Sequence, residues 1–487
     1  MAENRKISGF YLSAYQYGFV EKFLNPNSAP NHLLHAPVGS GKTITSSAII
    51  YEMVKSGAKR ILILVPALVL VDQYKKVLSE IAQDITVVSL SRKIVREIET
   101  LKQVETFWAR SISIVSLQMA ASEEIKKSIL SVQWDLIIID EVEHVVAGSK
   151  HASLIKMMIE EQIAKRILIL SNLPPTMLSR ANKKRFLNSK LFDNFETTNW
   201  NRRNIFSGQS IREVKFTIIN YERTKDEVSF IKKYTNLSKW LLEKNFQNKI
   251  RSRLVSSSLY AAEESLRSLR NRLVHDDLNS VLDISETGKE FVKDEELLGD
   301  TNLIHIDKKL SKKDFLNLKN DLSLTFDLLD EIQVDSKFNA LLKVIKDIQN
   351  KKQNTWIYAS YQSTISYLHS SLSETSPNIY QIHGQMPSRQ ASETIQRFRD
   401  EGGILIASTS LLKGVDLPLD SLVLYDIPES ENLMYVTFTR LSNPSRKKTN
   451  EPLSIFVFDD ISKAQKSEQG RLRKLQGFLQ KLVQEEM

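Results

Sequence analysis

The sequence predicts an α/β protein with two doubly wound parallel sheets and a helical insertion between them. Short, continuous apolar runs alternate with helical stretches towards both ends of the chain, which is typical of parallel strands buried on both faces. Between them, residues 226–247, 254–274 and 313–345 carry apolar residues at the spacing typical of helices. Ligands of such sheets bind beyond the carboxyl ends of the strands.

The first half of the chain has the clearer strand pattern. Residues 32–35 lead into a glycine-containing loop, and residues 44–54 predict the helix that follows it. Two more helices are expected at 12–17 and 68–82. Buried strands are expected at 60–65, 85–90, 111–116, 134–139 and 166–171.

The α/β pattern returns after the helical stretch, with strands expected at 355–360, 378–383, 403–408, 422–425 and 454–458. Residues 283–300 are acidic and lack a clear period, so we expect an exposed connection there. The end of the chain predicts an amphipathic helix that either caps the second sheet or docks a partner. The expected parts are a first α/β domain (1–205), a mainly helical insertion (206–334), a second α/β domain (335–460) and a terminal helix (461–487).

Composition restricts the function classes. With 487 residues the chain exceeds one ordinary core, and a net charge of +9 favours a polyanionic partner such as nucleic acid, although many soluble proteins are basic. There is no cysteine, which excludes disulfides, cysteine-ligated zinc, iron–sulfur clusters and cysteine nucleophiles. No long apolar segment or secretory signal is evident, so we expect a cytoplasmic protein without a membrane span.

The strongest local motif is APVGSGKT at residues 36–43. Glycines let backbone N–H groups turn towards phosphate oxygens, and the start of a helix adds partial positive charge. The lysine of such a loop reaches the β- and γ-phosphates, and the following hydroxyl contacts Mg²⁺. Ala36 stands where the strict pattern has glycine, and the alternative is a chance Gly-Ser loop. The residues expected to bind ATP and Mg²⁺ are Gly39, Ser40, Gly41, Lys42 and Thr43.

A pair of acidic residues, Asp140 and Glu141, follows the buried strand expected at 134–139. Carboxylates at this place in a phosphate-binding sheet can hold the hydration shell of Mg²⁺ and deprotonate the attacking water. We therefore expect Asp140 to be the metal residue and Glu141 the catalytic base. The alternative is an acidic helix cap, since acids commonly follow strands.

The order of these motifs resembles that of superfamily-two helicases and translocases, which contain two RecA-like domains. The resemblance covers nearly the whole chain. Its matching segments are LSAYQ with Gln16, VPAL at 65–68, DEVEH at 140–144, SNLP at 171–174, QIHG at 381–384, STSLLKGVDLP at 408–418 and YVTFTR at 435–440.

Within this superfamily, the chain is most similar to the Swi/Snf-type group and its RapA/HepA-like members. The pattern LxxYQ near the start is typical of that group. So are residues 335–342, DSKFNALL, at the entry to the second domain. Residues 253–258, RLVSSS, followed by Leu266, resemble the same group within the insertion.

The resemblance implies further site residues. Gln16 would read the adenine, Asp416 would meet the nucleotide or couple the two domains, and Arg440 would be an arginine finger for the γ-phosphoryl group. A surface arginine is the alternative for Arg440. Contacts to the nucleic-acid backbone would come from Ser116, Ser360, His383, Gly384 and Ser408, each of which is otherwise a plain residue at a strand end.

Three motifs depart from the superfamily pattern. Glu143 replaces the histidine of DEAH, and Asn172-Leu173 replaces Ala-Thr. Asn443 occupies the place of a second arginine after Arg440, for which Arg446 is a candidate replacement. In the superfamily, the histidine of DEAH and the Ala-Thr segment couple the ATP state to the other domain. We therefore expect ATP hydrolysis that is intact but slow or dependent on a partner.

Two functional hypotheses remain from the sequence. The favoured one is a nucleic-acid-stimulated ATPase, specifically a double-stranded DNA translocase that remodels protein–DNA complexes or serves a DNA repair or defence assembly with protein partners. The alternative is a helicase-like binding module that uses ATP as a conformational switch with weak hydrolysis. The departures favour the switch, whereas Lys42, Thr43, Asp140, Glu141 and Arg440 favour the motor.

Overall fold

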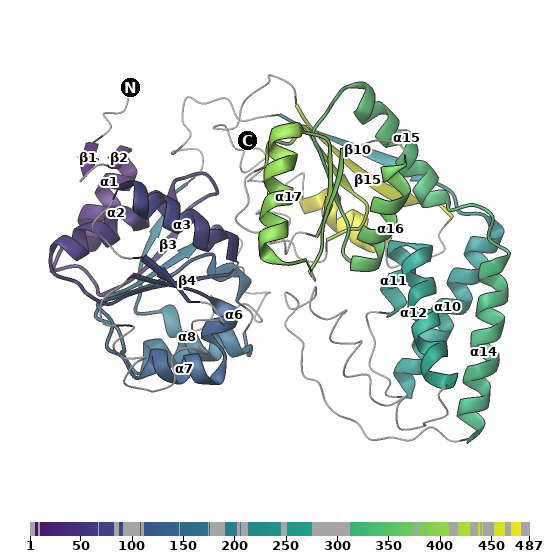
Figure 1. Ribbon diagram of the computed structural model, residues 1–487, viewed down its shortest axis with the longest axis horizontal. Coiled ribbons are helices and arrows are strands. Elements are labelled where there is room, and N and C mark those ends of the chain that lie inside the picture. Colours follow the sequence, from purple (N-terminus) through teal and green to yellow (C-terminus); the bar gives the residue numbers. More distant parts are fainter. Residues whose placement is uncertain are drawn as a thin grey trace.

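Two large parallel sheets and a bundle of helices form most of the described part of the chain (Figure 1). The computed structural model describes residues 5–7, 10–66, 68–81, 87–90, 108, 112–145, 147–173, 175, 190–201, 205, 213–244, 251–274, 312–374, 378–384, 386–408, 417–428, 437–438, 441, 452–462 and 469–478. The expected acidic connection at 283–300 lies outside these residues, as do Asp416, Arg440, Asn443 and Arg446. The predicted fold class, with two doubly wound parallel sheets, is confirmed.

The first lobe is built on a seven-stranded parallel sheet with the order β5-β6-β4-β7-β8-β3-β9. A short antiparallel pair, β1 (Arg5–Ile7) and β2 (Phe10–Leu12), precedes it. The sheet strands are β3 (Asn31–His35), β4 (Ile61–Val65), β5 (Val87–Ser89), β6 (Ile112–Ser116), β7 (Leu136–Ile139), β8 (Ile167–Ser171) and β9 (Glu196–Asn199). The helices are α1 (Ala14–Leu24), α2 (Lys42–Lys55), α3 (Leu68–Ile81), α6 (Leu117–Ala120), α7 (Glu123–Leu130) and α8 (Lys150–Glu160), with short 3₁₀ turns η1 (Val142–His144) and η4 (Lys190–Phe192).

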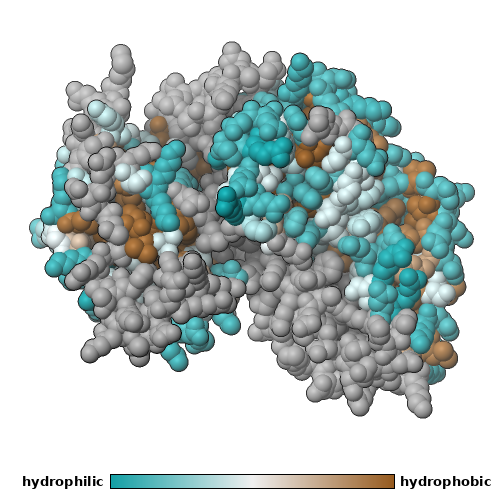
Figure 2. All heavy atoms as spheres, viewed as in Figure 1, coloured by the Kyte–Doolittle hydropathy of each residue, from teal (hydrophilic) through white to brown (hydrophobic). Residues whose placement is uncertain are grey.

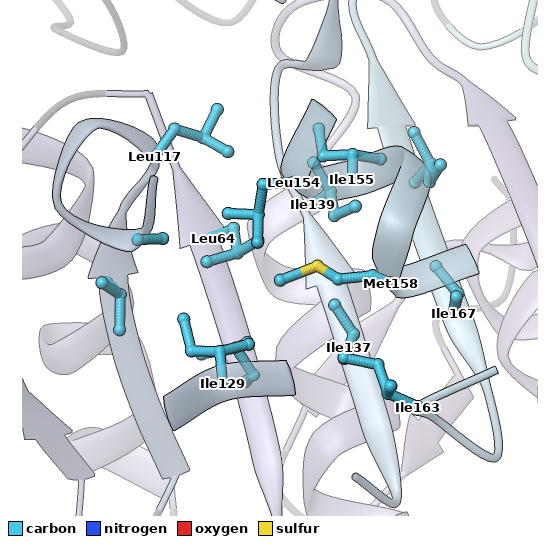
Figure 3. Packing of buried hydrophobic residues seen from close by; sticks show 14 of the residues in the cluster. Leu64, Leu117, Ile129, Ile137, Ile139, Leu154, Ile155, Met158, Ile163 and Ile167 are labelled. Carbon is cyan, nitrogen blue, oxygen red and sulfur yellow. The ribbon is translucent and has the colours of Figure 1, made fainter. Parts of the chain in front are cut away.

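The continuous apolar runs of this sheet serve two cores. In β7, Ile137 and Ile139 belong to one buried cluster, whereas Leu136 and Ile138 belong to the other. Successive side chains of a strand point to opposite faces, so a strand covered on both sides needs apolar residues at every position. Figure 3 shows one of these faces, where Met158 and its neighbours on α8 lie over the strands.

The second lobe is built on a six-stranded parallel sheet with the order β10-β15-β14-β11-β13-β12. Trp356 and Tyr358 of β11 face one buried cluster and Ile357 faces the other, so this sheet is also covered on both sides. Its strands are β10 (Val214–Tyr221), β11 (Thr355–Tyr358), β12 (Ile379–Ile382), β13 (Ile404–Ala407), β14 (Ser421–Leu424) and β15 (Leu453–Asp460). Its helices are α15 (Ser336–Asn350), α16 (Gln362–Ser373) and α17 (Ser388–Glu401).

Strand β10 changes the expected boundary of the insertion. Residues 214–221 fall in the segment expected to be mainly helical, yet they pair in parallel with β15 from Val214 to Tyr221. The second lobe therefore begins with β10, and the helical insertion lies between β10 and α15. Its helices are α10 (Lys225–Glu243), α11 (Arg251–Ser257), α12 (Leu259–Val274) and α14 (Lys312–Asp330), which lie beside the second lobe on the side away from the first (Figure 1).

The periphery of the second lobe carries two further helical features. Residues 469–478 are helical, and Leu472 and Leu475 are buried in the core of the second lobe, as expected for a capping helix. Helix α17 presents a hydrophilic surface in Figure 2, with ion pairs between Arg389 and Glu393 and between Arg397 and Glu401.

Among the helices that the structure describes, none has the length and apolarity needed to cross a bilayer.

Candidate active site

The glycine loop joins the end of β3 to the start of α2. Gly39 and Gly41 have φ angles of 83° and 81°, a left-handed conformation that side-chain-bearing residues rarely adopt. Gly41 is the N-cap of α2, and its carbonyl accepts the first helical hydrogen bond, from the Thr45 amide at 2.9 Å. The amide groups that precede this bond, in the first turn of a helix, have no acceptor within the helix, so the loop and the start of α2 together form a site for an anion.

Two side chains of α1 support this loop from behind. The Gln16 amide nitrogen donates to the Ser40 carbonyl at 2.9 Å, and the Tyr15 hydroxyl donates to the same carbonyl at 3.1 Å. The Gln16 side-chain oxygen accepts from the Ser13 amide at 2.9 Å. The structure therefore gives Gln16 a role in holding the loop, and its contact with adenine stays a prediction.

Alanine at position 41 is expected to disable this loop. A Cβ there would lie 2.2 Å from the Gln16 amide nitrogen, and the left-handed backbone would cost about 1–2 kcal/mol with any other residue. We expect kcat/KM for ATP to fall about 10- to 100-fold, because a small displacement of the phosphate-binding groups is costly. ATP titration and steady-state hydrolysis measure the effect.

Gly18→Ala is the matched control for that change. Gly18 lies on α1, and a Cβ there would meet nothing within 4 Å. Alanine in a helix is more stable than glycine by about 1 kcal/mol, so the control should raise the melting temperature slightly and leave hydrolysis unchanged. Equal activity of Gly41→Ala and Gly18→Ala would contradict the role given to the loop.

Lys42 is the first residue of α2 and its ammonium group lies within the loop. It donates to the carbonyls of Ala36 at 3.0 Å and Pro37 at 3.2 Å. Burial raises the pKa of Asp140, and the positive charge of Lys42 offsets part of that rise, so the two side chains interact electrostatically. The sequence motif therefore folds so that a lysine, a helix N-terminus and a carboxylate converge on one site.

Asp140 lies directly after β7 and is almost fully buried. Its carboxylate accepts from the Tyr74 hydroxyl at 3.0 Å and from the Glu141 amide at 2.8 Å. Burial, and next the charge of Glu141, raise the pKa of Asp140 to about 6. Tyr74 comes from α3 and also contacts the Ser46 hydroxyl on α2 at 3.1 Å, so it ties the carboxylate to the helix of the loop. The sequence offered no signal for Tyr74, because a buried tyrosine on an amphipathic helix resembles any core residue.

The donor set suits a magnesium ion. Asp140 offers carboxylate oxygen, and Thr43 offers a hydroxyl from the second residue of α2. Mg²⁺ prefers oxygen ligands, keeps several waters, and is commonly held by one or two carboxylates together with substrate phosphates. A buried carboxylate whose pKa is raised by desolvation is also a group that gains from a neighbouring cation. The residues present therefore fit the metal that the sequence predicts.

Glu141 has an unusual backbone conformation. Its φ of 47° and ψ of 49° lie in the left-handed region, although it has a full side chain. Conformations of this kind cost about 1–3 kcal/mol and persist where the surrounding structure enforces them, frequently at functional sites. The side chain of Glu141 is buried beside Asp140, where a base for an attacking water is expected.

The loop after β8 closes this side of the site. The Asn172 side-chain amide donates to a carboxylate oxygen of Glu141 at 3.2 Å and to one of Glu143 at 2.6 Å. The backbone amide of Asn172 donates to the other carboxylate oxygen of Glu143 at 3.1 Å. Burial, and next the charge of Glu141, raise the pKa of Glu143 to about 7. Two residues that depart from the superfamily pattern are therefore bonded to each other.

The same loop is also tied to β3 and to the second lobe. His35 Nδ1 donates to the Leu173 carbonyl at 2.8 Å, since a carbonyl can only accept. Leu173 and Val38 of the glycine loop belong to the same buried cluster as Tyr380 and Phe398 of the second lobe. The phosphate-binding loop therefore packs against the second lobe, the side from which Arg440 is predicted to act.

The candidate nucleic-acid contacts divide into two sets. His383 and Ser408 directly follow β12 and β13, and Ser360 lies two residues after the end of β11. These strands are neighbours in the second sheet, so the three residues share one sheet edge. Gly384 is exposed beside them, and burial lowers the pKa of His383. Ser116 instead ends β6 as a nearly buried N-cap, and its hydroxyl accepts from the Met119 amide at 3.3 Å.

The segments that suggested the Swi/Snf-type group meet where the insertion joins the second lobe. The Lys337 ammonium donates to the carbonyls of Ser256 at 2.7 Å and Ser257 at 2.9 Å. It lies 3.5 Å from a carboxylate oxygen of Asp426, which accepts at its other oxygen from the Ser257 hydroxyl and the Ser360 amide. The turn between α11 and α12 is thereby fixed to the second lobe.

A second attachment holds the two ends of the insertion together. Glu227 at the start of α10 is fully buried, and its carboxylate accepts from the Ser336 amide at 3.0 Å and the Ser336 hydroxyl at 2.5 Å. It also accepts from the Thr224 amide at 2.7 Å, which caps α10. Since Ser336 begins α15, one carboxylate joins the residue where the chain leaves the second lobe to the residue where it returns.

Comparison with known families matches each lobe separately. Residues 10–176 match the family described as type III restriction enzyme, res subunit, and residues 336–442 match the helicase conserved C-terminal domain. In fold, the chain is similar to a solved structure of S. cerevisiae Dbp5 bound to RNA and ADP BeF3, with a TM-score of 0.52 at 11% identity. That likeness covers 96% of this chain and 87% of the Dbp5 chain.

Curated relatives are similar at low identity. A putative ATP-dependent RNA helicase of Methanocaldococcus jannaschii is 21% identical over 82% of this chain and 52% of that protein. The ATP-dependent RNA helicase DBP8 of Eremothecium gossypii is 26% identical over 28% of this chain and 32% of its own length. RapA of Pseudomonas putida, an RNA polymerase-associated protein, is 28% identical over 30% of this chain and 15% of its own length. The chain thus spans about half the length of these relatives or less.

Proposed function

We propose that this chain, a superfamily-two helicase-like ATPase by its two matching domains, is an ATP-dependent nucleic-acid motor, and specifically a double-stranded DNA translocase of the Swi/Snf type. One observation carries the proposal. Asp140 is joined through Tyr74 to helix α2, which begins with Lys42, and the loop before this helix packs against a second lobe that is also built on a parallel sheet. A nucleotide bound there would lie between two bodies that can close and open.

Each residue has a distinct part in the proposed hydrolysis. Lys42 and the amide groups at the start of α2 bind and orient the phosphates. Thr43 and Asp140 would hold Mg²⁺, which would supply positive charge next to the phosphates. Glu141 accepts a proton from the attacking water. Arg440 stabilises the charge that develops on the transferred phosphoryl group when the lobes close.

The nucleic acid is proposed to run along the sheet edge of the second lobe that carries Ser360, His383 and Ser408. Contacts at such edges mostly touch phosphates, so they track a strand without reading its sequence. The net charge of +9 favours a polyanion of this kind. The relatives include proteins named as RNA helicases as well as RapA. The choice of duplex DNA therefore rests on the segments that resemble the Swi/Snf-type group, in which Lys337 binds the insertion at Ser256.

The substrate class is tested by ATP turnover with duplex DNA, single-stranded DNA, duplex RNA and single-stranded RNA at matched phosphate concentration. We expect duplex DNA to stimulate hydrolysis most, and displacement of a third strand from a DNA triplex to require ATP. Greater stimulation by RNA would overturn the choice of substrate. A flat response to all four, with tight ATP binding, would instead support a binding module that uses ATP as a conformational switch.

A further inference from the structure

Two of the departures from the superfamily pattern, Glu143 and Asn172, are joined by hydrogen bonds. Glu143 stands where a histidine is usual, and Asn172 stands where an alanine is usual. A histidine can donate a hydrogen bond and a carboxylate accepts, whereas alanine offers neither and an asparagine amide donates twice. In the superfamily pattern the donor would be the histidine that follows β7. In this chain it is Asn172, in the loop after β8.

We infer that Asn172 is a positioning residue for the base Glu141, and that Glu143 is the partner that orients it. The inference rests on the proposed ATPase function. The Asn172 amide has two hydrogens and uses one towards each carboxylate, at 3.2 Å to Glu141 and 2.6 Å to Glu143. Glu143 accepts from both the side chain and the backbone of Asn172, so it fixes the rotamer and the direction of the amide.

Burial makes this arrangement specific. Asn172 is 2% exposed and Glu141 is 5% exposed, so water has little room to replace a lost donor. Without the amide, the carboxylates of Glu141 and Glu143 would lose the donor that they share, and like charges that lie close together repel. The left-handed backbone of Glu141, with φ of 47°, sets the direction in which its side chain leaves the main chain. The Asn172 side-chain amide then holds the carboxylate at the other end.

A set of paired substitutions tests the inference through kcat and KM for ATP. Asn172→Ala is expected to lower kcat about 10- to 100-fold with KM changed less than about threefold, because the amide acts on the base and not on nucleotide binding. Asn172→Asp should lower kcat further, since it adds another carboxylate next to those of Glu141 and Glu143. Glu143→Gln keeps an acceptor for the Asn172 backbone amide and should lose less activity than Glu143→Ala.

The double variant Glu143→His with Asn172→Ala restores the residue types of the superfamily pattern. It is expected to be more active than either Glu143→His or Asn172→Ala alone. Substitutions at two independent sites would instead have additive effects. Asn350→Ala at the end of α15 is the control for loss of an asparagine far from the site. Melting temperatures of all variants report whether each one folds.

The outcomes separate this inference from the proposed function. Absence of ATP turnover by the wild-type chain would remove the proposed function itself. If the wild-type chain hydrolyses ATP but Asn172→Ala stays within about threefold of it, Asn172 does not position the base. A raised KM with unchanged kcat would assign Asn172 to nucleotide binding, and simple addition of the two single effects in the double variant would contradict the pairing.

Discussion

Replacing Lys42 with alanine is expected to reduce ATP hydrolysis by at least about 10²- to 10³-fold, the range seen when one preorganised transition-state donor is lost. The ammonium group lies within the loop at 3.0 Å from the Ala36 carbonyl, and its charge acts on the carboxylate of Asp140. Without it, the developing charge on the transferred phosphoryl group loses the cation that the loop supplies. Phosphate release under steady-state conditions measures the loss.

Lys55→Ala is the matched control, because Lys55 ends the same helix α2 and is exposed. It should hydrolyse ATP at the wild-type rate, with and without nucleic acid. Nucleic-acid-stimulated turnover retained by Lys42→Ala would contradict the assignment of the catalytic site, provided that both variants melt at the wild-type temperature.

Replacing Lys337 with methionine is expected to cost about 3–5 kcal/mol of stability, the range found when one partner of a buried ion pair is removed. Lys337 is 4% exposed, donates to two carbonyls of the insertion, and lies 3.5 Å from Asp426, which is itself buried. Its ammonium also lies 4.2 Å from the centre of the Tyr425 ring. Methionine fills similar volume but leaves the carboxylate and both carbonyls without this donor.

The loss should appear in chemical denaturation as a shift of the transition that unfolds the second lobe and the insertion. Lys343→Met provides the control, since Lys343 lies on the same helix α15 and is exposed. A surface lysine usually changes stability by less than about 0.5 kcal/mol. Equal midpoints for the two methionine variants would show that the junction with Ser256 and Ser257 does not stabilise the lobe.

Most of the fold could be predicted because buried parallel strands have a strong signature. The apolar runs predict strands that include residues 61–65, 136–139 and 404–407, and β4, β7 and β13 form there. β10 was missed because an edge strand is covered incompletely. All of its residues but Tyr221 are half-buried or exposed. Its pairing with β15 joins segments more than two hundred positions apart, which no local sequence pattern indicates.

The candidate site shows a similar division. Lys42 and Asp140 could be named from sequence because a loop after one strand and an acid after another lie at the same edge of a parallel sheet. Contacts made by packing could not be named, including Tyr74 with Asp140 and Gln16 with Ser40. Glu143 and Asn172 were visible only as two separate departures, since their hydrogen bonds join residues that are distant in the chain.

The central claim is that nucleic acid bound along the second lobe accelerates ATP hydrolysis at the site around Lys42. The most direct measurement is the rate of phosphate release by the wild-type chain at saturating ATP and Mg²⁺, first alone and then with increasing duplex DNA. We expect the rate to rise with DNA and reach a plateau, and the Lys42→Ala chain to remain at background throughout. A wild-type rate that stays unchanged across the DNA titration would contradict the claim.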